Sequence, residues 1–411
     1  MIEQIRNNTP AIIGIVGFLF IVGYMPFFEQ SFVYDEPHYL SNLQLIDIHG
    51  LGGAFIENLK GPAGPLYTYI HYIFSPLTHG AVIPTRLVNV FISLVIVLLL
   101  YKTLAHLNPK KKSIALLFFA IPMSFSTVSI ALTEIPAMLF FTAFVLIVSK
   151  AITKSIEAQK RISLWTFALA GLLLSIAISG RQPYLVCIAG MSPLLFTRDP
   201  STRKGLLLGG LVALLIPLYL FYHWQGIAPM IGRSIVRQEL LSLPHFLLGL
   251  GYGAVTVWLL APHFFFKPSR KVLSFYLASL PVLFVLNVKL DFGFLIMYSL
   301  VTSIIPESMW PYVSYFMASM LTLVGIYFVH TLVKRSLEHR TDMLFLSFVL
   351  SVFLILLTNI SITHIFSTRY VFQAAPLYII LASYYYRYSR LTFVANILGV
   401  ILGMVSIITY Q

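Results

Sequence analysis

Long apolar stretches recur from one end of this 411-residue chain to the other, and they restrict its fold more than any other feature. Most of them approach the roughly 20 residues that an α-helix needs to cross a bilayer. Only helices satisfy all their backbone hydrogen bonds within one segment of lipid-exposed chain. Apolar residues make up 58% of the chain and charged residues 10%, against roughly 25% charged in soluble domains. The sequence therefore predicts an all-α, polytopic integral membrane protein.

The hydropathy pattern predicts about thirteen transmembrane helices in a single domain over residues 1–411, with no separate soluble domain. The first apolar run is too long for a secretory signal peptide and is interpreted as a retained span. Two spans that flank residues 180–183 are also consistent with one broken hairpin, and residues 292–305 with a segment that dips into the membrane. The expected spans are 11–28, 86–106, 113–129, 134–150, 164–179, 183–197, 205–223, 245–262, 272–288, 312–333, 343–359, 371–386 and 391–409.

The net charge of +13 is distributed unevenly across the predicted membrane. With a cytoplasmic N-terminus, the loops on the cytoplasmic side carry +15 and those on the other side −2. This is the positive-inside pattern of helical membrane proteins. Nucleic acid binding would need basic residues clustered on one presented surface, so the pattern argues against it. It also places the longest loop, residues 29–85, on the extracytoplasmic face of a plasma or bacterial inner membrane.

Two adjacent carboxylates, Asp35 and Glu36, open that loop. A side chain that stays ionised beside a bilayer is costly, and such a residue is a functional-site candidate by default. The alternative is that Pro37 begins a surface helix, with Glu36 as its cap and Asp35 stabilised by the helix dipole. The two acids alone leave both interpretations open.

Other charged residues lie at the outer ends of predicted spans, at the same depth. They are Arg86, Arg181, Arg369 and Glu134. A single arginine at this depth is commonly a snorkelling side chain. Four such groups from well-separated spans favour a shared polar cavity, roofed by the external loop.

Such a cavity suits the transfer of a sugar from a lipid phosphate to an acceptor hydroxyl or amine. Guanidinium groups bind phosphate oxygens bidentately and stay charged at any working pH. They would stabilise the charge that develops on the phosphate. A carboxylate would take the proton of the nucleophile as general base.

The long external loop has a helical pattern of its own. Tyr39, Leu43 and Ile46 follow Pro37 at helical spacing and predict an interfacial helix. Residues 50–53 end it, and residues 61–65 predict a stiff turn before Tyr67. The aromatic side chains of this loop suit stacking on a sugar, but they are equally typical of an aromatic belt at the membrane interface.

The order of these motifs resembles the GT-C superfamily of polyprenyl-phosphate-sugar glycosyltransferases. Protein O-mannosyltransferases and bacterial aminoarabinose transferases share the acid of the first loop, whereas residues 180–183 look closer to the dolichyl-phosphate-glucose glucosyltransferase. The likeness covers residues 30–190 and 360–380. The motifs that carry it are Asp35-Glu36, Pro65-Leu66-Tyr67, Arg86-Leu87-Val88-Asn89, Glu134-Ile135-Pro136, Gly180-Arg181-Gln182-Pro183, and Thr368-Arg369-Tyr370-Val371 with the downstream Pro376.

The resemblance implies roles for individual residues. Asp35 would be the catalytic base and Glu36 would shape the site. The donor phosphate would be bound by Arg369 and Arg86, with Arg181 and Lys60 as further candidates, although Gly61 interrupts the Lys-Pro-Pro motif that Lys60 resembles. The acceptor or the sugar would meet Glu134, Tyr67, His364 and Tyr370.

A divalent cation such as Mg²⁺ or Mn²⁺ is a further possibility, because metal dependence varies across the superfamily. Asp35, Glu36 and Glu134 could bind one, although their spacing does not require it. His364 is also consistent with a hydrogen-bonded histidine at the membrane interface.

The expected partners are a polyprenyl-phosphate-linked sugar, a glycan or lipid-linked glycan acceptor and membrane lipids. Direct displacement with inversion is the expected course of the reaction. A lipid-linked-sugar transporter or flippase and a non-catalytic relative are the alternatives. Transporters usually carry charges near the membrane midplane, whereas the charges here lie at one edge, which favours an enzyme.

Overall fold

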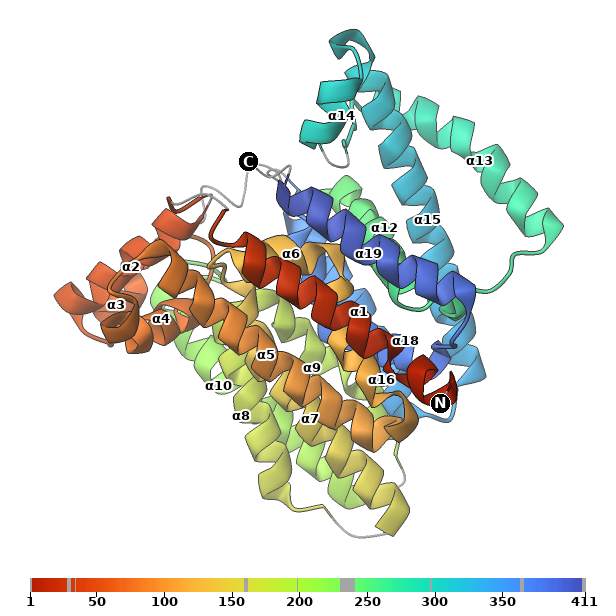
Figure 1. Ribbon diagram of the computed structural model, residues 1–411. Helices are drawn as coiled ribbons and strands as arrows, with labels where there is room; N and C mark the ends of the chain where they lie inside the picture. The colour runs from red at the N-terminus through yellow and green to blue at the C-terminus, as the bar shows by residue number, and fades with distance from the viewer. Residues whose placement is uncertain are drawn as a thin grey trace.

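The computed structural model describes residues 2–27, 31–33, 35–158, 162–197, 199–229, 241–295, 298–362 and 366–408. These residues form helices joined by short loops, and none of them lies in a β-strand (Figure 1). The prediction of an all-α membrane protein is confirmed by this architecture and by the length and composition of its helices.

All thirteen predicted spans fall on helical structure, but not all are single straight helices. In the described part of the chain, eight helices are long and apolar enough to cross a membrane: α5 (Val82–Leu107), α7 (Glu134–Ala158), α10 (Pro200–Trp224), α12 (Leu243–Leu260), α13 (Arg270–Lys289), α15 (Trp310–Glu338), α16 (Met343–Leu357) and α19 (Arg390–Ile408). The remaining predicted spans are shorter or broken: the apolar part of α1 (Ile2–Tyr24), which is Asn8–Tyr24, the bent pair η1 (Pro109–Ala120) and α6 (Pro122–Ser129), α8 (Leu164–Gly180), residues 182–196, and α17 (Arg369–Phe372) with α18 (Ala375–Tyr385).

Two of the breaks occur at prolines. The chain turns by 66° between η1 and α6, where Pro122 begins the second helix. After Gly180 it continues as three short pieces, η2 (Gln182–Leu185), α9 (Val186–Gly190) and η3 (Ser192–Phe196). Helix α8 packs against α7 and α10, whereas α9 packs against α16, so the two arms diverge at Arg181. Proline lacks the N–H that a continuous helix would need, which explains why the breaks fall here.

The loop between the first two predicted spans folds into three helices, of which the first contains the predicted interfacial helix. They are α2 (Glu36–His49), α3 (Gly53–Glu57) and α4 (Leu66–Thr78), and they cover one end of the bundle (Figure 1). Helix α2 ends at Gly50, whose φ of 69° lies in the left-handed region that favours glycine. Gly64 packs so closely on α8 that a Cβ would lie 1.8 Å from the carbonyl oxygen of Ser179. This close contact holds the loop against the end of α8.

Helix α18 lies at the centre of the bundle. All its residues from Ala375 to Ser383 are buried, which suits a helix that is apolar on every side. The short helix α17 and a two-residue turn precede it, and α17 begins at Arg369. The central helix therefore carries an arginine to the end of the bundle that α2, α3 and α4 cover.

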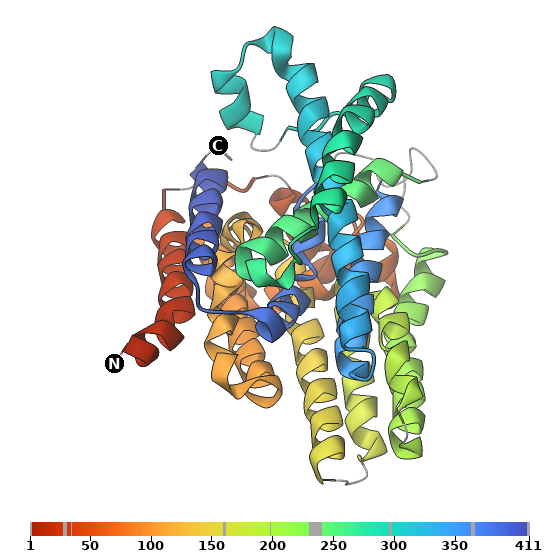
Figure 2. The ribbon, with the colours of Figure 1, turned by 90° about the vertical axis from the view of Figure 1, so that its right-hand side faces the viewer.

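Helices α13, α14 (Tyr298–Ile304) and one half of α15 project from the rest of the molecule (Figures 1 and 2). Helix α13 packs against α15, and most of its apolar side chains are exposed. An exposed apolar face is expected on a helix that lipid surrounds. The interpretation of residues 292–305 as a segment that dips into the membrane stays a prediction.

Candidate functional site

Glu36 and Arg86 form a fully buried ion pair. The Arg86 Nε donates to Glu36 Oε1 at 3.0 Å and its Nη2 to Oε2 at 2.7 Å, with both side chains 0% exposed. The backbone N–H of Ala131 donates to Glu36 Oε1 at 2.7 Å, and that of Val33 donates to Oε2 at 2.8 Å. Each carboxylate oxygen thus accepts two hydrogen bonds. The pair ties the first loop to α5 and to the segment before α7.

Asp35, the neighbour of Glu36, faces a different partner. Its Oδ2 lies 2.6 Å from Nη2 of Arg369, and its side chain is 41% exposed. Asp35 occupies the N-cap position of α2, but its side chain makes no capping hydrogen bond, and Glu36 is the first residue of the helix rather than its cap. The interpretation of Glu36 as the helix cap is therefore wrong, whereas the stabilisation of Asp35 by the helix dipole stays a prediction.

Glu134 and Arg181 extend the cluster. Arg181 Nη2 lies 2.9 Å from Glu134 Oε1, and Arg369 Nε lies 3.8 Å from the same oxygen. Arg181 also donates to the hydroxyl of Thr133 at 3.3 Å. Asp35, Arg369, Glu134 and Arg181 therefore form one continuous row of alternating charge. These residues come from the start of α2, the start of α17, the start of α7 and the end of α8.

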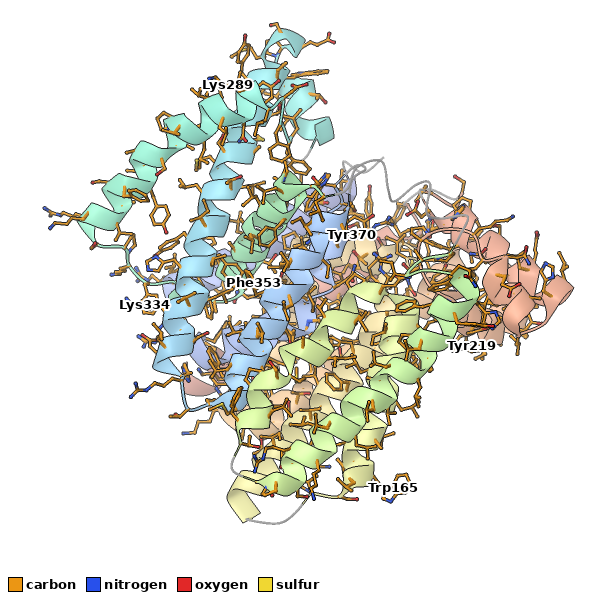
Figure 3. The ribbon with its side chains drawn as sticks, turned by 180° about the vertical axis from the view of Figure 1, so that it is seen from behind. Trp165, Tyr219, Lys289, Lys334, Phe353 and Tyr370 are labelled. Carbon is orange, nitrogen blue, oxygen red and sulfur yellow. The ribbon has the colours of Figure 1, made fainter. Side chains whose placement is uncertain are left out.

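Two tyrosines flank the row. The ring of Tyr370 lies 5.3 Å from the guanidinium carbon of Arg369 and 5.5 Å from that of Arg181, within the range of a cation–π contact. Burial raises the pKa of the Tyr39 hydroxyl to about 12, and the arginines oppose this shift only in part. Tyr39 is therefore a neutral hydroxyl. Figure 3 shows Tyr370 and Trp165 at opposite ends of the bundle, with Tyr370 at the end that carries the row of charges.

Tyr67, predicted to contact sugar, is buried beneath Tyr39. The two ring centroids lie 5.7 Å apart, and the Tyr67 ring lies 4.2 Å from that of His71. Within the described chain, neither the Tyr67 hydroxyl nor the ring nitrogens of His71 have a hydrogen-bond partner. A polar group buried in this way normally bonds to a partner. The Tyr67 hydroxyl and the His71 ring nitrogens are therefore available to bond to a substrate or to water.

Burial lowers the pKa of the His71 imidazole from 6.5 to about 4, and the Asn89 amide opposes this shift without satisfying hydrogen-bond geometry. Because the folded pKa lies below the unfolded one, the unfolded chain binds the extra proton between these pH values. The stabilisation is present above pH 6.5 and is lost as the pH falls towards 4. We expect a loss of about 3 kcal/mol over that interval. The temperature of thermal unfolding in detergent should therefore fall as the pH is lowered from 6.5 to 4 in the wild type. It should fall less in His71→Leu. The exposed His49 supplies a control, because His49→Gln should retain the wild-type slope.

Lys60 and Arg86 lie apart from the row of charges. The Lys60 side chain is exposed, and its backbone N–H and C=O bond to the side chain of Asn42 at 3.0 Å each. Arg86 is bonded to Glu36, and its predicted contact with a donor phosphate stays untested. His364 lies outside the described residues, so its predicted role also stays untested.

The three acids suggested for a cation are not brought into one ligand set. Glu36 is bonded on both oxygens to Arg86 and to backbone amides, while Asp35 and Glu134 are each paired with Arg369, at its Nη2 and its Nε. Among the described residues, no three histidine, cysteine or acidic side chains are grouped so that they could hold a metal ion. The donor set proposed from the sequence therefore does not fit a divalent cation.

Several residues of the site were missed by the sequence reasoning. The backbone amides of Val33 and Ala131 carry no signal in a sequence. Thr358 and Asn359, which line a cavity together with Arg181, had a signal, because they follow directly on the apolar run of α16.

The fold and this ionic cluster define the class: a polytopic helical membrane protein with a charged site at one end of its bundle. No known family profile and no curated protein matches the sequence. Two solved structures are similar, and both are of ArnT from Cupriavidus metallidurans.

The structure of ArnT bound to undecaprenyl phosphate is 12% identical, with a TM-score of 0.46, and the match covers 98% of this chain and 77% of that one. The apo structure is 12% identical with a TM-score of 0.44, covering 97% and 76%. A likeness at this level assigns no role to any residue.

Proposed function

We propose that this protein is a membrane glycosyltransferase that moves a sugar from a polyprenyl phosphate (or diphosphate) to an acceptor hydroxyl on the extracytoplasmic face. The observation that carries this proposal is the 2.6 Å contact between Asp35 and Arg369. These residues are more than 300 positions apart, and their contact joins an acid that can act as base to a cation that can bind phosphate. Glu134 and Arg181 complete the row beside them.

In the proposed reaction, Asp35 is the general base. The acceptor oxygen attacks the anomeric carbon of the donor sugar while its proton passes to the Asp35 carboxylate. The bond between that carbon and the phosphate oxygen breaks, and its electron pair leaves with the phosphate. One base and one displacement suffice, so we expect inversion at the anomeric carbon.

Arg369 and Arg181 are the proposed phosphate ligands. Both guanidinium groups contact Glu134, which holds them side by side without using all their donors: within the described chain, Nε of Arg181 and Nε of Arg369 have no hydrogen-bond partner. A phosphate that bridges the two arginines would compete with Asp35 for Arg369. Donor binding would thereby release the carboxylate to act on the acceptor. The partly exposed pair is cheap to break, because such pairs contribute only about 0–1 kcal/mol.

An apolar cavity of about 470 Å³ suits the isoprenoid tail of the donor. It is lined from α7, α8, α9 and α10, with Phe144, Leu174 and Leu211 among its walls. Phe144 lies ten residues after Glu134 on α7, which is about 15 Å along a helix. The tail of a lipid phosphate held at the charged row could therefore extend into this cavity.

The Glu36–Arg86 pair has a structural role in this proposal. Glu36 accepts four hydrogen bonds, two from Arg86 and two from backbone amides, and these fix the residue next to the base. The pair is completely buried, which separates it from the exposed face of Asp35. Glu36 therefore positions Asp35, and Arg86 is not proposed as a phosphate ligand.

The proposed function is tested by glycan analysis of cells that make this protein. Deleting the gene should remove one sugar from a cell-envelope glycan, as detected by mass spectrometry, and the wild-type copy should restore it. The purified protein should also carry polyprenyl phosphate. An unchanged glycan profile together with a lipid-free protein would contradict the proposal.

A further inference from the structure

A second cavity, of about 230 Å³, lies directly beside Arg181 and Tyr370. Its walls come from the turn before α4, the break after α8, the end of α10 and η6 (Thr358–Ser361). Pockets for drug-sized ligands begin at roughly 300 Å³. This cavity is therefore suited to a smaller group, such as a single ring.

The polar side chains of the cavity already donate hydrogen bonds to other groups of the protein. The hydroxyl of Thr358 donates to the carbonyl of Ile355 at 2.6 Å, and that of Ser361 donates to Thr358 at 2.7 Å. A hydroxyl has one donor and two acceptor lone pairs, so acceptors are what these two residues retain.

The three amide side chains retain groups of both kinds. Their nitrogens donate to backbone carbonyls: Gln182 to Pro62 at 3.0 Å, Gln225 to Tyr222 at 3.2 Å and Asn359 to Leu356 at 2.9 Å. Each bond leaves a second N–H donor on the nitrogen, and the amide oxygen remains an acceptor. The cavity therefore offers acceptors together with some donors, which match sugar hydroxyls, because each hydroxyl both donates and accepts.

Asn359 provides an independent sign that a ligand belongs here. Its side chain is 1% exposed, and its Oδ1 has no hydrogen-bond partner within the described chain. Leaving a buried acceptor unsatisfied costs about 1–3 kcal/mol. The buried Nε of Arg181, at the mouth of the same cavity, also lacks a partner there. A bound group would satisfy both.

The charge of the cavity restricts that group further. Arg181 is the charged side chain among the described lining residues, and none of these is acidic. A positively charged amino group would find no carboxylate among these residues, and the nearby Glu134 carboxylate is already paired with Arg181 at 2.9 Å. From these contacts we infer that the cavity holds the neutral, hydroxyl-rich ring of the donor sugar, in preference to an amino sugar. This inference rests on the proposed function, because it takes Arg181 as a phosphate ligand.

The order of the row identifies the ring as that of the donor rather than the acceptor. The sugar is bonded to the phosphate, so it must lie next to an arginine that binds the phosphate, and Arg181 faces both the row and the cavity.

Binding to the purified full chain in detergent tests the inference. The three probes are undecaprenyl phosphate alone, the same lipid carrying glucose and the same lipid carrying a 4-amino sugar. We expect glucose to tighten binding about tenfold, which is what one or two new hydrogen bonds contribute. The amino sugar should add no affinity. Asn359→Ala should abolish the gain from glucose and leave the affinity for undecaprenyl phosphate within about twofold of wild type.

Two further variants keep the test informative if Asn359→Ala folds poorly. Ser361→Ala, at an exposed position, should lower the gain from glucose by a few fold. Asn359→Asp adds an acid of the same shape and should reverse the order of the two sugars. Equal affinities for the three lipids, or a wild-type preference for the amino sugar, would overturn the inference.

These outcomes are separable from a failure of the proposed function. A preference for the glucose lipid in a protein whose deletion leaves all glycans unchanged would retain the cavity assignment and remove the enzyme. A glycan that is lost on deletion, together with equal affinities for the three lipids, would remove the cavity assignment alone.

Discussion

Replacing Asp35 with asparagine is expected to lower the rate of sugar transfer by about 10²–10⁴-fold, the range associated with a positioned general base. The amide has the shape of the carboxylate but cannot accept the proton of the acceptor. Because Asp35 is partly exposed and its pair with Arg369 contributes little to stability, the variant should fold normally. Donor binding should persist, because the arginines remain. The measurement is transfer of labelled sugar from a polyprenyl phosphate donor in membranes.

Asp47→Asn is the matched control for this variant. Asp47 lies on the same helix, is exposed, and accepts a hydrogen bond from Tyr72 at 3.2 Å, outside the row of charges. Its replacement should leave transfer within about twofold, as expected for a surface substitution without a special role. Normal product from Asp35→Asn would leave only transport or scaffolding as functions of the site. A sugar bonded covalently to Asp35 would contradict inversion by one displacement.

The helices and the charged row were predictable from the sequence because both follow from the cost of charge in lipid. Glu134, Arg181 and Arg369 stand at the ends of apolar runs, and the runs themselves place these residues at one depth. Hydropathy predicts the depth of a residue in the membrane but not its position within the membrane plane. The pairing of these residues depends on that position. Arg86 illustrates this limit, since its motif suggested a phosphate ligand whereas the fold pairs it with Glu36.

The cavity beside Arg181 and Tyr370 could not be predicted from the sequence, for a similar reason. Gln182, Gln225 and Asn359 come from three segments, and their common property is which of their atoms are already bonded. That property exists only after the backbone carbonyls around them are in place. A pattern of residue types can show that amides lie near the outer ends of helices, but it does not show which amide atoms remain to bind a ligand.

The second large effect is a loss of stability when the buried pair of Glu36 and Arg86 is broken. Glu36→Gln should lower the free energy of unfolding by about 3–5 kcal/mol, because it leaves the Arg86 guanidinium buried without its countercharge. The measurement is thermal unfolding in detergent, together with the yield of folded protein.

The exposed pair of Glu57 and His223, joined at 2.8 Å, supplies the control. Glu57→Gln should cost at most about 1 kcal/mol, since exposed ion pairs contribute little. The double variant Glu36→Gln with Arg86→Met should be less destabilised than Glu36→Gln alone, because it removes both buried charges together. A Glu36→Gln protein that unfolds like the wild type but transfers no sugar would instead place Glu36 in the chemistry, and Arg86 would then have to be reconsidered as a ligand of the donor.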